Sequence, residues 1–158
     1  MKFQDVVMEY GTDALFTGLA VGGICYLSEE KGDRTARVWQ TWDPESQSYV
    51  GGTAVNVSLM NGVIAGSSEL IMRTMVDGVA ELVNADPEGV VVQVLPSVLT
   101  ATVATALPPI VAATVPRLGQ KYGKYVAEER GYVRQFGTVF MGSLIGQRVS
   151  GIVADQMN

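Results

Sequence analysis

Side chains that usually perform catalysis are scarce in this 158-residue chain. Histidine, the commonest general base and metal ligand, does not occur in it. The single cysteine, Cys25, has no partner for an internal disulfide, and its apolar neighbours indicate a packed thiol. Glu128 and Glu129 are adjacent, but on a helix they would point about 100° apart, which does not suit a catalytic pair of carboxylates. We therefore expect a protein that is not an enzyme and that uses no cofactor or metal ion.

The stretch 89–116, which contains no charged residue, organises the rest of the chain. Asp86-Pro87 before it is a typical helix start, and Pro108-Pro109 is expected to end that helix. A helix over 87–107 would be about 31 Å long at 1.5 Å per residue, close to the thickness of a bilayer's hydrocarbon core. The sequence therefore predicts one membrane-spanning helix within a hydrophobic span at 87–116.

The predicted span has two different faces. One carries large aliphatic side chains suited to lipid, and the other carries small side chains on which a second helix can pack. The aliphatic face consists of Val92, Leu95, Leu99 and Val103, and the small-residue face of Ser97, Ala101, Ala104 and Thr105. The segment is also rich in valine and threonine. A second interpretation is therefore a soluble α+β protein with 89–116 buried in its core.

Amphipathic helices are predicted over 3–27, 54–85 and 117–158. In the middle one, an apolar arc is expected to pack against an apolar partner, and a charged arc lies opposite. The apolar arc is Met60, Ile64, Ile71, Met75, Val79 and Leu82; the charged arc is Glu69, Arg73, Asp77 and Glu81. Two further spacings of glycines allow close helix packing, at Gly18/Gly22 and at Gly142/Gly146. Gly62 and Gly66 lie on the polar arc, which indicates a close backbone approach or a weak point.

The net charge of −5 is unevenly distributed. An acidic flank precedes the hydrophobic span, and the basic segment 117–134 follows it, which predicts that the C-terminal side faces the cytoplasm or a particle interior. The basic side chains expected at this interface are Lys121, Lys124, Arg130 and Arg134. Trp39 and Trp42 would lie at the headgroup level of a membrane protein, or would cap the core of a soluble one.

These patterns predict a mainly α, single-domain protein over 1–158 that is associated with a lipid membrane. Its expected role is structural: it would pack with copies of itself or with other structural proteins in an envelope, a membrane-containing virion or a membrane complex. One alternative is a soluble virion or adaptor subunit in an oligomer. Another is a module that binds nucleic acid or anionic lipid through 117–134.

Overall fold

The chain is mainly α-helical, as the sequence predicts. The computed structural model describes residues 3–28, 41–43, 48–50, 54–114 and 131–157. Within these ranges there are four long helices: α1 (Phe3–Ser28), α3 (Ala54–Leu82), α4 (Val90–Thr114) and α6 (Tyr132–Met157). Two short strands, β1 (Thr41–Asp43) and β2 (Ser48–Val50), pair antiparallel with Trp42 opposite Tyr49.

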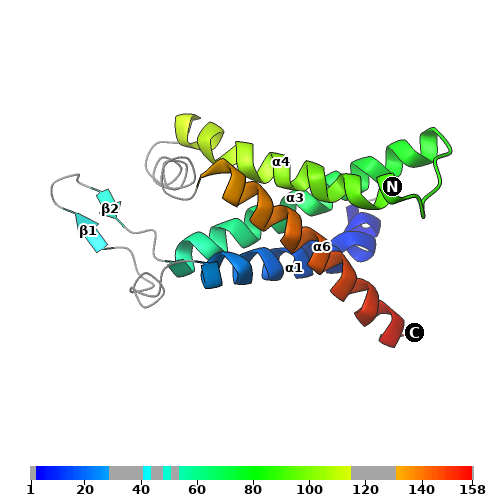
Figure 1. Ribbon diagram of the computed structural model, residues 1–158, viewed down its shortest axis with the longest axis horizontal. Coiled ribbons are helices and arrows are strands. Elements are labelled where there is room, and N and C mark those ends of the chain that lie inside the picture. Colours follow the sequence, from blue (N-terminus) through cyan, green and yellow to red (C-terminus); the bar gives the residue numbers. More distant parts are fainter. Residues whose placement is uncertain (1–2, 29–40, 44–47, 51–53, 115–130, 158) are drawn as a thin grey trace.

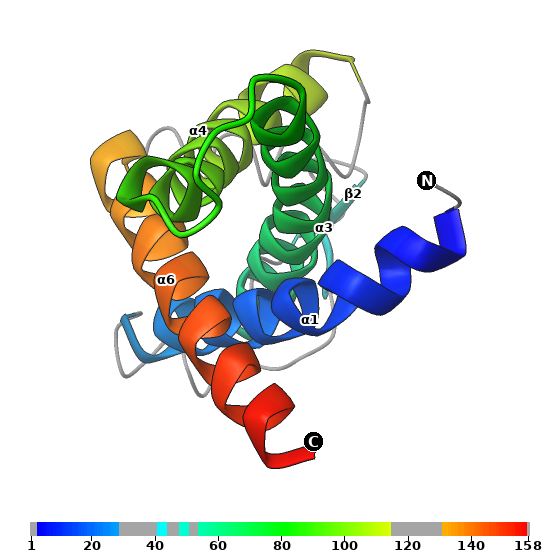
Figure 2. The same ribbon diagram turned by 90° about the vertical axis from the view of Figure 1, so that its right-hand side faces the viewer.

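The four helices run alternately up and down and form a ring (Figures 1 and 2). α1 contacts α3 and α6, and α4 contacts the same two helices from the other side. Both chain termini lie at one end of the bundle, next to the α3–α4 turn, and β1 and β2 lie at the other end (Figure 1). We call the first the acidic end, after Asp13, Asp77, Glu81, Asp86, Glu88 and Asp155, and the second the ribbon end.

The turn at the acidic end is built by specific backbone hydrogen bonds. Asn84 has a φ of 51°, and the amides of Asn84 and Ala85 donate to the carbonyls of Glu81 and Ala80 at 3.2 and 2.8 Å. This pattern is a Schellman motif, in which asparagine tolerates the left-handed conformation better than most residues. It ends α3 at Leu82 rather than at residue 85, where the sequence prediction placed the end.

The predicted limits of the hydrophobic helix, 87 and 107, are both wrong. The Glu88 amide donates to the Asp86 carboxylate at 3.0 Å, which holds residues 86–89 in a turn, and the amide of Gln93 donates to the carbonyl of Gly89 at 3.1 Å. The helix therefore begins at Val90, and it continues through Pro108-Pro109 to Thr114. A proline removes one hydrogen bond from the preceding turn but does not by itself terminate a helix that is held by its neighbours. The alternative of buried strands over 89–116 is excluded for residues 90–114, which are helical.

The orientation of α3 contradicts the sequence prediction over the second half of the helix, whereas Ile64, in the first half, packs against the core as predicted. Ile71, Met75 and Leu82, from the arc expected to pack inward, are 54%, 58% and 83% exposed. Glu69, from the opposite arc, is completely buried. Gly62 and Gly66 explain why the polar arc of α3 faces inward, because they allow the backbone of α1 to approach that side of the helix.

Close backbone contacts at glycines join the helices inside the bundle. A Cβ at Gly66 would lie 2.6 Å from the carbonyl oxygen of Ala14, and one at Gly62 would lie 2.7 Å from that of Gly18. On α6, a Cβ at Gly146 would lie 2.4 Å from the amide nitrogen of Thr17. For Gly62 and Gly66 the sequence allowed two interpretations, a close backbone approach or a weak point in the helix. The structure shows the close backbone approach.

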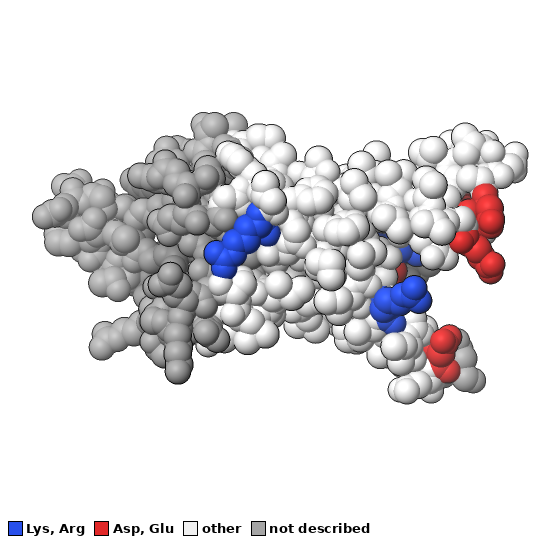
Figure 3. Space-filling model, viewed as in Figure 1, with Lys and Arg blue, Asp and Glu red and all other residues white. Residues whose placement is uncertain are grey.

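The distribution of side chains is the reverse of that in a typical water-soluble protein. Apart from Val21, Val139 and Pro96, the fully buried positions are occupied by small or polar residues, including Thr17, Asn61, Glu69, Ser97, Thr100, Gln135 and Ser143. Large aliphatic side chains are exposed on every helix: Leu15, Leu19 and Leu27 on α1; Leu59, Val63 and Val79 on α3; Val90, Val91 and Ile110 on α4; and Val133, Met141 and Ile152 on α6. On the face shown in Figure 3, a broad band without charged side chains separates basic atoms near the ribbon end from acidic and basic atoms near the acidic end.

Candidate functional site

A buried carboxylate, Glu69, is the centre of a four-residue cluster that joins three helices. Its Oε2 accepts a hydrogen bond from the Ser143 hydroxyl at 2.6 Å, and its Oε1 accepts one from the Gln147 amide group at 2.7 Å. The same amide group lies 3.0 Å from Ser97 Oγ, and Ser97 Oγ lies 2.7 Å from Ser143 Oγ. We call Glu69, Ser97, Ser143 and Gln147 the Glu69 cluster.

The hydrogens of this cluster can be counted. The Gln147 amide group has two, which go to Glu69 and Ser97. Ser143 has one hydroxyl hydrogen, and because it goes to Glu69, the Ser97 hydroxyl supplies the hydrogen for the Ser97–Ser143 bond. Four hydrogens thus make four bonds in a closed ring, and none of them has to come from Glu69. The ring can accommodate a carboxylate without a counter-ion in hydrogen-bonding contact.

A second polar layer lies nearer the ribbon end. The amide group of Gln135 donates to Asn61 Oδ1 at 2.6 Å, and the amide group of Asn61 lies 3.1 Å from Cys25 Sγ. All three side chains are buried, so the packed thiol expected at Cys25 is observed. Asn61 precedes Glu69 on α3 by eight residues, or about two helical turns. Gln135 precedes Ser143 on α6 by the same number. This spacing separates the two polar layers by about 12 Å along the bundle.

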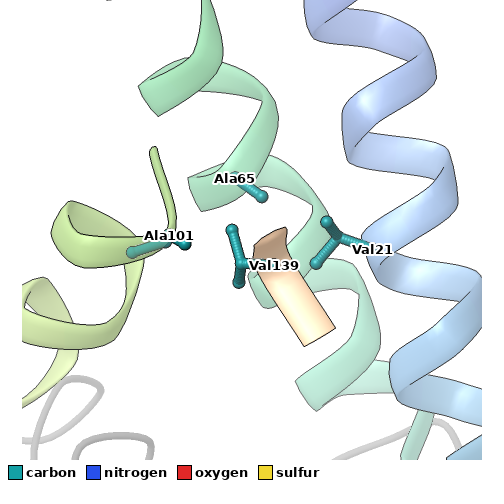
Figure 4. Close-up of a cluster of buried hydrophobic side chains, with 5 residues drawn as sticks. Val21, Ala65, Ala101 and Val139 are labelled. Atoms are coloured by element: carbon teal, nitrogen blue, oxygen red, sulfur yellow. The ribbon is translucent and has the colours of Figure 1, made fainter. Parts of the chain in front are cut away.

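An apolar layer fills the space between the two polar layers. It is formed by Val21, Ala65, Ala101 and Val139, one residue from each helix, and all four side chains are fully buried (Figure 4). Phe136 and Phe140 pack against it, with their ring centroids 6.1 Å apart. The bundle axis therefore runs from a polar layer through an apolar layer to a second polar layer.

Charged side chains continue from the Glu69 cluster toward the acidic end. Arg73, one turn along α3 from Glu69, lies 4.0 Å from the Asp13 carboxylate of α1 and 3.7 Å from the Asp77 carboxylate. Along α3 itself, the ion pair of Arg73 is therefore the one with Asp77, four residues further on. All three side chains are partly accessible, whereas Glu69 is not.

The residues singled out in the sequence occupy varied positions. Ser97 and Ala101 are fully buried, Thr105, Val92, Leu99 and Val103 are half-buried, and Leu95 is 39% exposed. Gly18 and Gly22 face α3, and Gly142 and Gly146 face α1. Arg134 is exposed and donates a hydrogen bond to the Ser28 carbonyl. Trp42 lies in β1, and Trp39, Lys121, Lys124 and Arg130 lie outside the described residues.

Sequence reasoning treated Glu69 as a member of a charged helix face and therefore missed the cluster. A signal was present in α6, where Gln135, Ser143 and Gln147 recur at multiples of four residues on one face. Such a row of neutral polar residues, opposite exposed aliphatic ones, indicates a helix whose polar side faces protein. Within the described residues, no group of three or more Cys, Asp and Glu side chains is placed to hold a metal ion.

One helix in the described part of the chain is long and apolar enough to cross a membrane. Its segment Val90–Leu107 has a mean hydropathy of 1.9, and 28% of it is buried within the bundle. Length and composition alone are weak evidence, because the core helix of a soluble protein meets the same criteria. Comparisons of the chain with models of protein families, with characterised proteins and with solved structures found no match.

Proposed function

We propose that this chain is an integral membrane protein whose four helices all cross the bilayer, and that its role is structural. The observation that carries the proposal is the reversed distribution of side chains: small and polar residues lie inside and large aliphatic residues outside. Water favours the opposite arrangement, whereas lipid favours this one, because lipid tails solvate Leu, Ile and Val but not Asn, Gln or Glu.

The lengths of the exposed apolar faces support four spans rather than one. On α1 this face extends from Val7 to Leu27 and on α4 from Val90 to Ile110, about 30 Å in each case at 1.5 Å per residue. The face on α6, from Val133 to Ile152, is nearly as long, and the face on α3 extends from Leu59 to Leu82. Except on α4, the uncharged runs in the sequence are shorter than these faces. Asp13 and Arg73 interrupt the runs of α1 and α3 while turning toward each other, and the exposed Arg148 interrupts the run of α6. Each outer face thus matches the thickness of a hydrocarbon core.

Polar groups on the outer faces also suit a lipid environment. Thr102 is exposed on α4, yet its hydroxyl donates to the carbonyl of Val98 at 2.8 Å, in the preceding turn. Thr74 does the same with the carbonyl of Leu70 on α3. Such side chains present a methyl group outward and need no water to satisfy the hydroxyl.

A water-soluble oligomer is the alternative, and the exposed faces distinguish the two. Partner subunits cover one or two sides of a bundle, whereas the large apolar side chains here occur on all four helices. A bilayer covers every side at once. The binding of nucleic acid through 117–134 rests on sequence alone, because residues 115–130 lie outside the described residues.

The positive-inside rule gives the proposed orientation. Eight lysines and arginines occur in or next to the segments that join α1 to α3 and α4 to α6: Lys31, Arg34, Arg37, Arg117, Lys121, Lys124, Arg130 and Arg134. Of the remaining three, Arg73 and Arg148 lie in the halves of α3 and α6 nearer the acidic end, and Lys2 precedes α1 in the sequence. We therefore propose that the ribbon end faces the cytoplasm, or the interior of a membrane-bounded particle.

The structural role is proposed because the bundle interior is filled. The apolar layer lies across the bundle axis. The apolar outer surface includes a groove of about 710 Å³ between α1 and α3, lined by Leu15, Leu19, Leu59 and Val63. Such a surface suits lateral packing among lipids, copies of the chain and other membrane proteins.

Membrane integration is tested by washing membranes or particles that contain the full-length protein with alkaline carbonate, followed by detergent. We expect the protein to stay in the carbonate pellet and to be released by detergent. Recovery in the carbonate supernatant, or of a monodisperse oligomer in the absence of detergent, would show that the apolar faces are covered by protein instead. Quantitative recovery in a fixed ratio to other particle or complex proteins is expected for a structural component.

A further inference from the structure

We propose that the groove between α1 and α3 is a lipid-binding site, which holds one acyl chain of an anionic phospholipid with its headgroup at the ribbon end. The inference rests on the proposed membrane location of the four helices. It goes beyond that location because it assigns one ligand to one place on the outer surface. Four observations carry it: the walls of the groove, its dimensions, the glycines at its ends, and the polar and charged groups near the ribbon end.

The groove has a floor of glycines and walls of aliphatic side chains. Its floor lies where the neighbouring helices α1 and α3 touch (Figure 2): a Cβ on Gly18 would lie 2.8 Å from the carbonyl oxygen of Gly62. The walls are four side chains that are 60–68% exposed: Leu15 and Leu19 on α1, and Leu59 and Val63 on α3. A groove with such walls binds an apolar chain that lies along it.

The dimensions of the groove favour an acyl chain over a helix. Its lining extends from Gly11 to Tyr26 on α1 and from Ser58 to Leu70 on α3, which is about 22 and 18 Å at 1.5 Å per residue. An acyl chain spans about half of the hydrocarbon core, or about 15 Å, and therefore fits along the groove. Over these lengths, the volume of about 710 Å³ gives a mean cross-section of about 32–39 Å². A helix about 10 Å in diameter has a cross-section of about 80 Å², so it would rest on the walls and leave the floor unfilled.

Two glycines at the ends of the groove serve no helix contact in the described part of the chain. Gly23 has no atom within 4 Å of an added Cβ, and Gly11 meets only Val7 of its own helix, at 3.7 Å. Glycine within a helix is unfavourable relative to alanine, and here it leaves both ends of the groove open. Leu15 and Leu19 lie between the two glycines on the same row of α1. This row therefore lacks the spacing of four residues at which small side chains let a second helix approach.

A buried hydroxyl group near the ribbon end of the groove lacks a hydrogen-bond partner. Ser58 lines the groove and is 6% exposed, and its hydroxyl makes no hydrogen bond within the described residues. It lies one turn from the start of α3, beside Gly22 of α1. A buried hydroxyl without a partner is costly. The ester carbonyl at the head of a lipid's acyl chain is an acceptor that the Ser58 hydroxyl can use.

The charges at the two ends of the groove give the direction of the lipid. At the ribbon end, the Arg134 guanidinium donates to the carbonyl of Ser28, the last residue of α1, and forms no ion pair with a described carboxylate. At the other end, Arg73 faces the carboxylates of Asp13 and Asp77, and these three side chains together carry a net negative charge. A lipid phosphate is therefore attracted to the ribbon end and repelled from the acidic end.

Photo-crosslinking in proteoliposomes tests the site on the full-length protein. The probe is phosphatidylglycerol with a diazirine group in one acyl chain, diluted into phosphatidylcholine vesicles. We expect peptide mapping by mass spectrometry to find most adducts within 11–26 and 58–70, in excess over those on the exposed α6 side chains Met141 and Ile145. Unlabelled phosphatidylglycerol should compete with this labelling more strongly than added phosphatidylcholine.

Two pairs of variants separate the groove from the rest of the outer surface. Gly23→Leu obstructs one end of the groove and should reduce its adducts to the level on α6. Gly137→Leu, at a position on α6 that also has no atom within 4 Å of an added Cβ, should leave them unchanged. Arg134→Gln keeps a donor for the Ser28 carbonyl but removes the charge, so the preference for phosphatidylglycerol should fall about fivefold. Arg148→Gln, which removes an exposed charge nearer the acidic end of α6, should preserve that preference.

Two results would overturn the inference: adducts spread evenly over the outer faces of all four helices, or groove adducts that unlabelled phosphatidylglycerol does not reduce. A protein that is dimeric in detergent and has no adducts in the groove would show that a second copy covers it, and would also refute the proposal. Carbonate extraction of the protein would contradict the proposed membrane location. A carbonate-resistant protein with evenly spread adducts would contradict this inference alone.

Discussion

At the scale of single residues, the interior is held by hydrogen bonds between side chains of different helices more than by bulky apolar contacts. The Glu69 cluster joins α3, α4 and α6, and the Cys25–Asn61–Gln135 layer joins α1, α3 and α6. Every member of the Glu69 cluster is bonded to two others, so the removal of one leaves buried polar atoms without partners. Such a loss costs more free energy than the formation of a single bond returns.

Substitution of Ser143 tests this reasoning. In Ser143→Ala, Glu69 Oε2 loses its donor and the Ser97 hydroxyl loses its acceptor, so we expect the free energy of unfolding to fall by about 1–3 kcal/mol. The matched control is Ser67→Ala on the exposed side of α3, for which we expect a change within about 0.5 kcal/mol. Denaturant titration in detergent micelles measures both. Equal effects of the two variants would show that the cluster contributes nothing specific.

At the scale of elements, glycine decides how closely the helices approach. The contacts of Gly62 and Gly66 with α1, and of Gly146 with Thr17, bring backbones together without intervening side chains. This proximity explains why α1 is packed against both α3 and α6 although its buried side chains other than Tyr10 are small or medium-sized. It also explains which arc of α3 faces inward.

Pairs of Gly→Ala variants separate this packing effect from helix propensity. In Gly66→Ala and Gly146→Ala the new Cβ would lie 2.6 and 2.4 Å from backbone atoms of α1, so α1 must move away. We expect each to lose about 1–3 kcal/mol of stability. Gly78 on α3 and Gly151 on α6 have no atom within 4 Å of the added Cβ. Their alanine variants should gain up to about 1 kcal/mol from helix propensity. Thermal unfolding in detergent compares the four, and destabilisation of all of them would refute the packing explanation.

A lysine introduced on the outer face of a helix tests whether lipid or water surrounds the four helices. Val63 is 68% exposed, in the first half of α3 within the apolar band, and Val133 is exposed at the ribbon end of α6. If lipid surrounds the bundle, Val63→Lys costs about 2.5–3.5 kcal/mol of insertion free energy and Val133→Lys much less, because its ammonium group reaches the interface. The carbonate-resistant fraction of each variant measures the difference. In a protein surrounded by water, both variants would leave solubility unchanged or raise it.

At the scale of the whole molecule, charge and apolar surface are arranged along one axis. The acidic end, the apolar band and the ribbon end follow one another, with basic residues concentrated in the sequence segments that join helices at the ribbon end. The same axis orders the interior into the Glu69 cluster, the apolar layer and the Cys25–Asn61–Gln135 layer. In the proposed membrane orientation, Glu69 lies nearer the non-cytoplasmic side of the membrane, and the Cys25–Asn61–Gln135 layer lies nearer the cytoplasm.

Cysteine accessibility tests this orientation in intact cells. The native thiol is removed by Cys25→Ser, which keeps a hydroxyl acceptor near Asn61, and single cysteines are introduced as Glu88→Cys at the acidic end or Tyr132→Cys at the ribbon end. A membrane-impermeant maleimide added outside should label Glu88→Cys and reach Tyr132→Cys only after permeabilisation. The opposite labelling pattern would reverse the proposed orientation, and labelling of both positions without permeabilisation would contradict four membrane spans.

The sequence by itself determined the helical class, the position of the uncharged segment, the spacing of the small residues and the scarcity of catalytic side chains. All of these follow from composition and from the periodicity of single segments. The tertiary structure decided which arc of α3 faces inward, where α4 begins and ends, and that Glu69, Ser97, Ser143 and Gln147 meet. Periodicity divides a helix into two faces, but it does not say which face meets other helices. That choice depends on the glycines and hydroxyl groups of partner helices distant in the sequence, and on whether water or lipid surrounds the bundle.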